Sequence, residues 1–206
     1  MKYSSTGTSL PLLNPETTHN AALAALRAAG ALPGGKWLLS KRYALRSPDL
    51  EREVFGMRFP NPVGVAAGYD PDGDTIEELS AAGFGFIEIG AVTPRPQPGS
   101  PRPRIFSIKS DNAILDRSGY PNKGLEYAMG NVRNRRKGII VGCNIAKNTI
   151  TSDEAAAGDY LKVFRNMYQY VDYFTVNVAC NTTAKSYVHS GRERIEELLA
   201  PLFEFR

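Results

Sequence analysis

The sequence predicts an α/β fold, in which helices cover a parallel sheet and a helical segment precedes it. From about residue 55, short apolar runs alternate with segments of helical periodicity. Strands that are almost continuously apolar are typical of parallel sheets buried on both faces. Glycine-rich turns follow these runs, as expected where strands end. The 206 residues, of which 42% are hydrophobic, suffice for one sizeable core.

The first 50 residues predict two helices. Residues 14–16 (Asn-Pro-Glu) begin the first with a cap, a first-turn proline and an acid near the positive helix end. Gly30 is expected to end it. The second centres on residues 37–39 (Trp-Leu-Leu), with basic residues at 36, 41 and 42. Apolar bulk beside basic groups is typical of an interfacial membrane helix. The alternative is a helical hairpin that packs on the main domain and exposes a solvated basic face.

The net charge of +4 belongs to this N-terminal segment. Residues 1–50 hold six basic and two acidic side chains, whereas residues 51–206 balance. Nucleic-acid binding needs a denser basic stripe, so the charge favours a membrane or anion-facing surface. No apolar run approaches the roughly 18 residues of a transmembrane helix, and residues 1–13 lack the apolar core of a signal peptide. Two cysteines cannot form a disulfide framework, which favours a reducing compartment.

The later elements follow in order along the chain. Apolar runs predict strands at residues 63–67, 84–92, 139–145 and 173–178. Helices are predicted at 75–82, in the segment 121–136 past its first turn, at 153–170 and at 192–205, with Ser152 or Asp153 capping the third of them. Gly124 and Gly130 weaken the second of these helices. The proline-rich segment 93–104 is stiff and extended. It could be a linker, but because it lies inside one α/β pattern we expect a rigid excursion over the strand ends.

Polar residues follow the predicted strands at their carboxyl ends, where parallel α/β folds bind ligands. Residues 67–70 follow the first strand, and Gly68 among them would allow a flat ligand to approach closely. Asn144 and Asn177 lie near the ends of the third and fourth strands. Each amide offers an acceptor and two donors, which suits the edge of a heterocycle. One such asparagine could equally be a turn residue, but two at equivalent ends favour a ligand site.

Two more groups are chemical candidates. The segment 116–120 is polar, and Arg117 in it could clamp a carboxylate or only pair with Asp116. Cys180 follows the fourth strand and could serve as nucleophile or base. A lone cysteine there is more often a small buried hydrophobe. The two histidines form no metal-binding pattern, so no metal is predicted.

Several motifs together resemble the dihydroorotate dehydrogenase family. They lie at residues 53–56, 61–64, 66–68, 83–88 and 92–99, and at Asn144 with 147–148. The proline-rich run is the most specific of them, and the helical N-terminal extension is similar to that of the membrane-associated, quinone-dependent class. The resemblance implies a TIM barrel that binds FMN, of which residues 51–206 would form about half. Residues 1–50 would be the membrane and quinone segment.

The resemblance also implies a reaction and its residues. Dihydroorotate would lose a proton to a side-chain base and a hydride to the flavin, giving orotate for pyrimidine biosynthesis, and a quinone would reoxidise the flavin. The protein would be peripheral, on the cytoplasmic face of the cell membrane. Flavin contacts would fall on Ala67, Gly68, Tyr69, Asp70, Ala91, Asn144 and Asn177. Substrate contacts would fall on Asp116, Arg117, Ser118, Gly119, Tyr120, Asn177 and Thr182, with Cys180 at the base position.

The chain departs from the family pattern at ligand positions. Pro71 stands in place of a lysine, Ala91 of a threonine and Asp116 of an asparagine, while residues 180–182 read Cys-Asn-Thr instead of Ser/Cys-Pro-Asn. Proline supplies neither charge nor donor, and a carboxylate would repel an anionic substrate. The alternative is therefore an impaired, truncated or redesigned homologue that keeps the fold. A third hypothesis is a membrane-surface binding module.

Length is a further constraint, because a TIM barrel needs about 250 residues. Residues 58–206 suffice for four strand–helix units. We therefore expect the chain to be a fragment, to pair with something, or to fold differently at its end.

Overall fold

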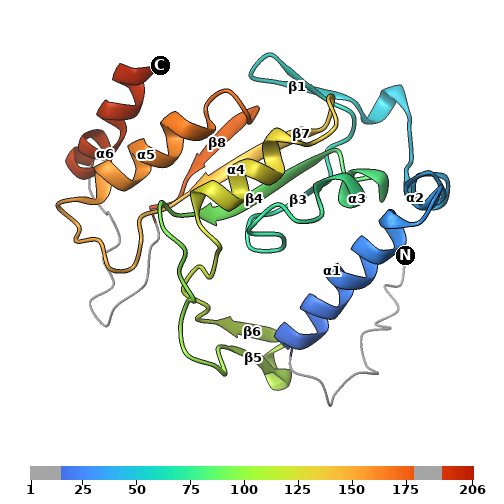
Figure 1. Cartoon of the computed structure of the whole chain (residues 1–206), viewed down its shortest axis with the longest axis horizontal. Coiled ribbons are helices and arrows are strands. Elements are labelled where there is room, and N and C mark those ends of the chain that lie inside the picture. The colour runs from blue at the N-terminus through green and yellow to red at the C-terminus, as the bar shows by residue number, and fades with distance from the viewer. Residues whose placement is uncertain (1–14, 179–191) are drawn as a thin grey trace.

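A four-stranded parallel sheet forms the centre of the computed structural model, which describes residues 15–178 and 192–206 (Figure 1). The strand order β3-β4-β7-β8 follows the chain. The strands are β3 (Gly64–Val65), β4 (Phe86–Val92), β7 (Ile140–Ile145) and β8 (Tyr173–Val176). The helices that accompany them are α3 (Ile76–Ala81), α4 (Leu125–Arg133), α5 (Ala156–Met167) and α6 (Arg192–Phe205). The predicted α/β fold with a parallel sheet is confirmed.

One face of the sheet packs against the helices and forms the core. Alternation along β4 and β7 places Ile87, Ile89, Val141 and Cys143 on this face, and all four are fully buried. Burial, reinforced by the nearby Glu88 carboxylate, raises the pKa of the Cys143 thiol. Cys143 is therefore an inert core residue. The helices contribute Leu79, Leu125, Val132, Tyr160, Val163, Met167, Leu198 and Leu202 to the same cluster.

The helix α4 begins past the first turn of the segment 121–136, as predicted. Gly124 before the helix has φ +84°, and Asn122 pairs with Gln97 in an isolated β-bridge, so the chain turns before it becomes helical. The predicted cap of α5 was wrong. The helix begins after Ala155 without a side-chain cap, while Asp153 pairs with Lys147 at 3.4 Å.

The sequence patterns did not predict two short antiparallel hairpins. One joins β1 (Arg52–Val54) to β2 (Met57–Phe59), and the other joins β5 (Ile105–Ile108) to β6 (Ala113–Asp116). Single helical turns lie at Pro48–Leu50 and Lys109–Asp111. Figure 1 shows the second hairpin projecting away from the sheet, beside one end of the first helix. Each strand has three or four residues, too few for a clear alternation signal.

The N-terminal helices pack on the α/β unit through ion pairs. Lys36 of α2 (Gly35–Tyr43) pairs with Glu77 and Glu78 of α3. Glu16 of α1 (Pro15–Ala31) pairs with Arg102 and Arg104 near β5. The helix α1 runs through Gly30 to Ala31, and a Cβ at Gly30 would overlap the Glu78 side chain, so glycine permits this close approach. The predicted cap at Asn14 lies outside the described residues.

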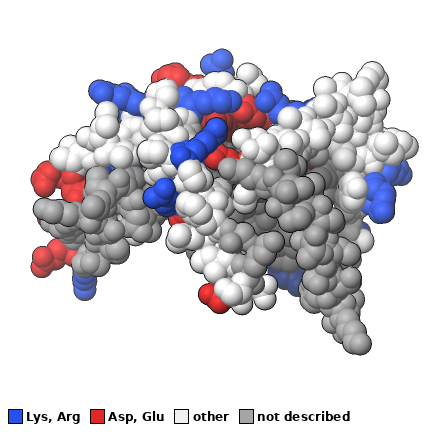
Figure 2. All heavy atoms as spheres, turned by 90° about the horizontal axis from the view of Figure 1, so that it is seen from below, with Lys and Arg blue, Asp and Glu red and all other residues white. Residues whose placement is uncertain are grey.

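The outer side of α2 remains exposed. Trp37 and Leu38 are 65% and 62% exposed, and the Lys41 ammonium lies over the Trp37 ring at 5.8 Å. Within residues 15–178 and 192–206, none of the helices combines the length and apolar character needed to cross a bilayer. On the face drawn in Figure 2, basic side chains of the described residues are interspersed with acidic and uncharged ones.

The attachment of α2 is expected to weaken in acid. The hydrogen bond from Lys36 lowers the pKa of Glu77 below its ordinary value of 4.5. A carboxyl group with a lowered folded-state pKa adds stability above its ordinary pKa, and that stability is lost as the pH falls through the lowered value. Because this is a half-exposed pair, Glu77→Gln should cost less than about 1 kcal/mol at neutral pH. In urea unfolding the difference from wild type should shrink as the pH falls below the ordinary pKa of 4.5 and through the lowered one. A difference that did not shrink in acid would contradict the assignment.

Candidate functional site

A polar cluster occupies the face of the sheet opposite the helical core. Glu88 of β4 is at its centre, and its carboxylate accepts hydrogen bonds from side chains of β7 and β8. Asn144 Nδ2 donates to Oε1 at 3.1 Å, while the Tyr173 and Thr175 hydroxyls donate to Oε2 at 3.2 and 2.9 Å. Burial and the Glu88 carboxylate raise the pKa of Tyr173, so its hydroxyl remains a donor at neutral pH. A Cβ at Gly142 would overlap the Tyr173 ring, so glycine makes room for this cluster.

The side-chain oxygen of Asn144 is a buried acceptor of this site whose hydrogen bonding is incomplete within the described part of the chain. The residue is 7% exposed, and none of the residues that the structure describes offers a hydrogen bond to its buried Oδ1. An unsatisfied buried acceptor typically costs about 1–3 kcal/mol, so such an atom needs an explanation. Asn177 lies beside it at the end of the next strand, where its N–H donates to the Ile145 carbonyl at 3.0 Å. The fold thus brings together the two asparagines that the sequence singled out.

The segment after β3 contributes an open, glycine-lined edge. The N–H of Gly68 donates to the Gly90 carbonyl at 2.8 Å, which joins the ends of β3 and β4. Gly68 has φ +95°, and the space beside it where a Cβ would stand is open. Ala67 is half-buried, and Ala91 is buried within β4. Tyr69 is exposed and meets His19 of α1 edge to face, with ring centroids 4.7 Å apart.

Asp70 turns its carboxylate back into the protein. The buried carboxylate accepts hydrogen bonds from the Asp74 and Thr75 N–H groups at 2.9 and 2.7 Å, and from the Thr75 hydroxyl at 2.8 Å. Asp70 therefore organises the turn before α3. The neighbouring Pro71 uses its carbonyl to accept from the Gly90 N–H at 3.0 Å, and its ring offers no donor to a ligand.

The proline-rich loop is tied to the strand ends rather than acting as a linker. Asn148, after β7, shares its Nδ2 among the Thr93 hydroxyl at 3.1 Å, the Arg95 carbonyl at 2.8 Å and Gln97 Oε1 at 3.0 Å. Its Oδ1 accepts from the Arg95 N–H at 3.0 Å. Asn122 binds the Thr93 hydroxyl as well. The expected rigid excursion over the strand ends is confirmed by these contacts.

The predicted substrate segment 116–120 lies against this loop. The Ser100 N–H donates to the Ser118 carbonyl at 2.8 Å, and Gln97 Nε2 donates to the carbonyls of Gly119 and Tyr120 at 3.3 and 3.0 Å. The Oε1 atom of the same Gln97 amide accepts a hydrogen bond from Asn148. Gln97 therefore links the segment 116–120 to Asn148.

The possible pairing of Arg117 with Asp116 does not form. Asp116 accepts from the Ser118 N–H at 2.7 Å, whereas Arg117 donates to the Pro103 carbonyl at 3.1 Å and covers the Phe106 ring. Both side chains are exposed. Cys180 and Thr182 lie outside the described residues, so their predicted roles remain predictions.

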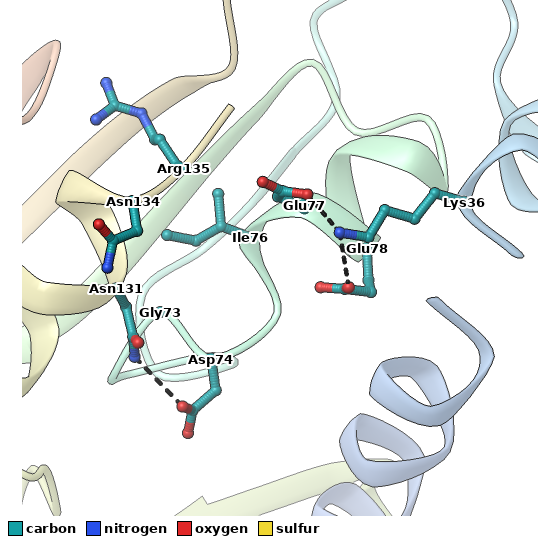
Figure 3. A pocket seen from close by; sticks show the side chains of 9 residues that line it. All are labelled: Lys36, Gly73, Asp74, Ile76, Glu77, Glu78, Asn131, Asn134 and Arg135. Atoms are coloured by element: carbon teal, nitrogen blue, oxygen red, sulfur yellow. Dashed lines mark hydrogen bonds and ion pairs between the residues drawn. The ribbon is translucent and has the colours of Figure 1, made fainter. Parts of the chain in front are cut away.

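Away from this site, a hollow lies between α2, α3 and α4 (Figure 3). It is lined by Lys36, Gly73, Asp74, Ile76, Glu77, Glu78, Asn131, Asn134 and Arg135. Its charged groups are paired: Lys36 reaches both Glu77 and Glu78, and Asn131 donates to Asp74 at 3.3 Å. Burial opposes ionisation of Asp74, but bonds from Lys123 and Tyr127 outweigh it and lower its pKa. We therefore interpret the hollow as part of the contact between α2, α3 and α4 and not as a ligand site.

Sequence reasoning missed the role of Glu88, Tyr173 and Thr175. A signal for Glu88 was present, because it is the one charged residue in the otherwise apolar segment 84–92. A charge in a buried strand must face a polar partner or a cavity. Among the described residues, no group of three or more His, Cys, Asp or Glu side chains is arranged to hold a metal ion.

Successive parallel β/α units with polar groups at their strand ends define a protein of the barrel-type α/β class. The chain belongs to the dihydroorotate dehydrogenase family, whose model, described as Dihydroorotate dehydrogenase, matches residues 49–205. The predicted family and the predicted partial α/β barrel are both confirmed.

Relatives named dihydroorotate dehydrogenase (quinone) match nearly the whole chain. The protein from Cellvibrio japonicus is 46% identical over 92% of this chain and 54% of its own length, and that from Christiangramia forsetii is 41% identical over 92% and 55%. A crystal structure of DHODH in complex with ferulenol from Eimeria tenella matches with TM-score 0.82 and 27% identity, covering 98% of this chain and 54% of that one. The chain spans about half the length of the curated relatives that it matches.

Proposed function

We propose that this chain supplies the flavin-facing strand ends of a quinone-linked dihydroorotate dehydrogenase, which oxidises dihydroorotate to orotate. The observation that carries the proposal is the buried Oδ1 of Asn144, which has no partner within the described protein and needs a donor from a ligand. The proposed substrate and the proposed quinone acceptor are based on the relatives described above, which are named dihydroorotate dehydrogenase (quinone).

The residues at the strand ends fit the FMN that this reaction requires. Gly68 leaves open space for a flat ring, while Asn144 and Asn177 would meet the polar edge of that ring. FMN, when bound, would supply the acceptor for the hydride of dihydroorotate. Cys180 is proposed as the base that takes the proton. The segment 116–120 would cover the substrate, held by the proline-rich loop.

The first test is flavin binding by the 206-residue chain. Titration with FMN should quench flavin fluorescence at a one-to-one ratio, and Asn144→Ala should weaken the affinity by about tenfold, since one buried hydrogen bond is worth about 1–1.5 kcal/mol. Asn166→Ala is the matched control, because Asn166 is exposed on α5 and its side-chain amide donates to the Lys162 carbonyl of its own helix at 2.8 Å. Wild-type protein that fails to bind FMN would contradict the proposal.

One observation favours a second candidate, a homologue that binds flavin without oxidising dihydroorotate. Pro71 provides no cation or donor where the family pattern has a lysine, and its carbonyl is already used by Gly90. Substrate would then lose a charge-assisted contact, typically worth about 1.5–3 kcal/mol. Dihydroorotate-dependent bleaching of bound FMN distinguishes the candidates: bleaching that is lost in Cys180→Ala supports the dehydrogenase, and FMN that binds without bleaching supports the second candidate.

We further propose that α2 attaches the protein to the cytoplasmic face of the membrane and brings it to the quinone. Trp37 and Leu38 are exposed beside Lys41 and Arg42, so an apolar surface lies next to cations that attract anionic headgroups. His19 of α1 contacts Tyr69, which follows β3 at the proposed flavin site. This contact favours a short path for a quinone from the N-terminal helices to the flavin.

The double variant Trp37→Glu/Leu38→Glu should lose vesicle binding at least about tenfold, because burying two such side chains stabilises binding by roughly 3–6 kcal/mol. The measurement is co-sedimentation with vesicles of phosphatidylcholine and phosphatidylglycerol. Phe203→Glu is the control, since Phe203 is equally exposed, at 65%, but lies on α6 at the far end of the molecule (Figure 1). Unchanged sedimentation of the double variant would refute the attachment.

A further inference from the structure

On the face of the sheet opposite the helical core, the Glu88 carboxylate accepts hydrogen bonds from three uncharged donors of the described residues. Glu88 Oε1 accepts from Asn144, and Oε2 accepts from Tyr173 and Thr175. These donors come from the adjacent strand β7 and from β8 beyond it, so Glu88 of β4 is held from one side of the sheet by two strands. A carboxylate fixed by several hydrogen bonds has little freedom to turn, and it holds whatever it contacts in one orientation.

This contact determines which way the Asn144 amide faces. A carboxylate accepts hydrogen bonds and donates none, so the group that Asn144 presents to Glu88 must be its NH₂. The amide oxygen must then point in the other direction. The oxygen is buried and has no donor among the described residues, whereas the amide nitrogen is occupied by Glu88.

We infer that Glu88 is a positioning residue, which orients the Asn144 amide so that its oxygen is offered as a hydrogen-bond acceptor to the ligand at the strand ends. The inference rests on the proposed function in taking FMN as that ligand. It also states the chemistry of the contact: the ligand atom that meets Asn144 carries an N–H or O–H donor. Without Glu88 the amide would rotate freely, and part of the population would present NH₂ to the ligand instead.

The test compares three replacements by FMN titration. Glu88→Met keeps the length of the side chain and removes the acceptor, and it should weaken FMN affinity by nearly as much as Asn144→Ala, about tenfold. Glu88→Gln keeps one oxygen for Asn144, because the Tyr173 and Thr175 hydroxyls can accept as well as donate. Its affinity should stay within threefold of wild type. In the double variant Glu88→Met/Asn144→Ala the affinity should equal that of Asn144→Ala alone, since Glu88 acts through that amide.

A merely structural role would give a different result, with additive losses in the double variant and no rescue by glutamine. Either outcome overturns the inference, as does wild-type affinity in Glu88→Met. If Glu88→Met fails to fold, Glu88→Asp takes its place, because the shorter side chain draws the acceptor away from Asn144, and undiminished affinity there would overturn the inference equally.

A second measurement does not involve flavin. The side-chain amide resonances of Asn144, assigned by their absence in Asn144→Ala, should move toward the positions of a free amide in Glu88→Met in the protein without FMN. Unchanged resonances contradict the positioning role. Absence of FMN binding by the wild type contradicts the proposed function instead, so the two failures can be told apart.

Discussion

Alanine in place of Gly90 is expected to lower the free energy of unfolding by about 3 kcal/mol or more. Gly90 has φ +110°, a conformation that residues with a Cβ rarely adopt. The added Cβ would overlap the Asn144 carbonyl oxygen and lie 2.9 Å from the Val92 nitrogen. These are backbone atoms at the junction of β4 and β7, so no side-chain rotation can relieve the overlap.

Urea unfolding of the two proteins measures this effect, and the matched control is Gly130→Ala. Gly130 lies within α4, and the space around its Cβ position is open. Alanine there should stabilise the protein by about 0.5–1 kcal/mol through helix propensity. Equal midpoints for Gly90→Ala and wild type would show that the strand ends do not meet as closely as described.

Removal of the Asn148 side chain is expected to destabilise the protein by about 2–4 kcal/mol and to release the proline-rich loop. Asn148→Ala leaves the Thr93 hydroxyl, both main-chain groups of Arg95 and the Gln97 side chain without this partner. Water can satisfy some of these groups only if the loop leaves the strand ends, and the segment 116–120 is held by that same loop.

Hydrogen exchange checks the result, because the Gln97 and Ser100 N–H groups are bonded to Asn122 and Ser118 in the structure. Both should exchange faster in Asn148→Ala than in wild type. Asn166→Ala serves again as control, with an expected change in stability below about 0.5 kcal/mol. Protection of Gln97 and Ser100 that is unaltered in Asn148→Ala would contradict the assignment of Asn148 as the residue that holds the loop.

Much of the sheet could be predicted from the sequence because its signals are local. Continuous apolar runs identified all four parallel strands, and the predicted bounds of α6 are those observed. The helix α4 begins past the first turn of the segment 121–136, as predicted, but the bridge from Asn122 to Gln97 before it could not be predicted because Gln97 is remote in sequence. The hairpin β5–β6 was missed since its strands are short and largely exposed.

The candidate site, too, could be predicted from the sequence only in part. Asn144 and Asn177 were identified because they lie at the ends of apolar runs, where the fold class alone predicts a ligand edge. The carboxylate of Asp70 accepts hydrogen bonds from Asp74 and Thr75, and no periodicity in the sequence indicates which way a loop carboxylate turns. The predicted place of Asp70 beside the flavin stays a prediction.

The sequence by itself determined the α/β class, the four parallel strands, the family and the asparagines at the strand ends, since each depends on short-range pattern or motif. Only the tertiary structure decided that Glu88 holds the Asn144 amide, and that the proline-rich loop and the segment 116–120 are joined. Glu88 and Tyr173 are 85 positions apart, and Asn148 and Arg95 are 53. Contacts at such separations follow from how strands pair and side chains fill space, and those relations exist only once the chain has folded.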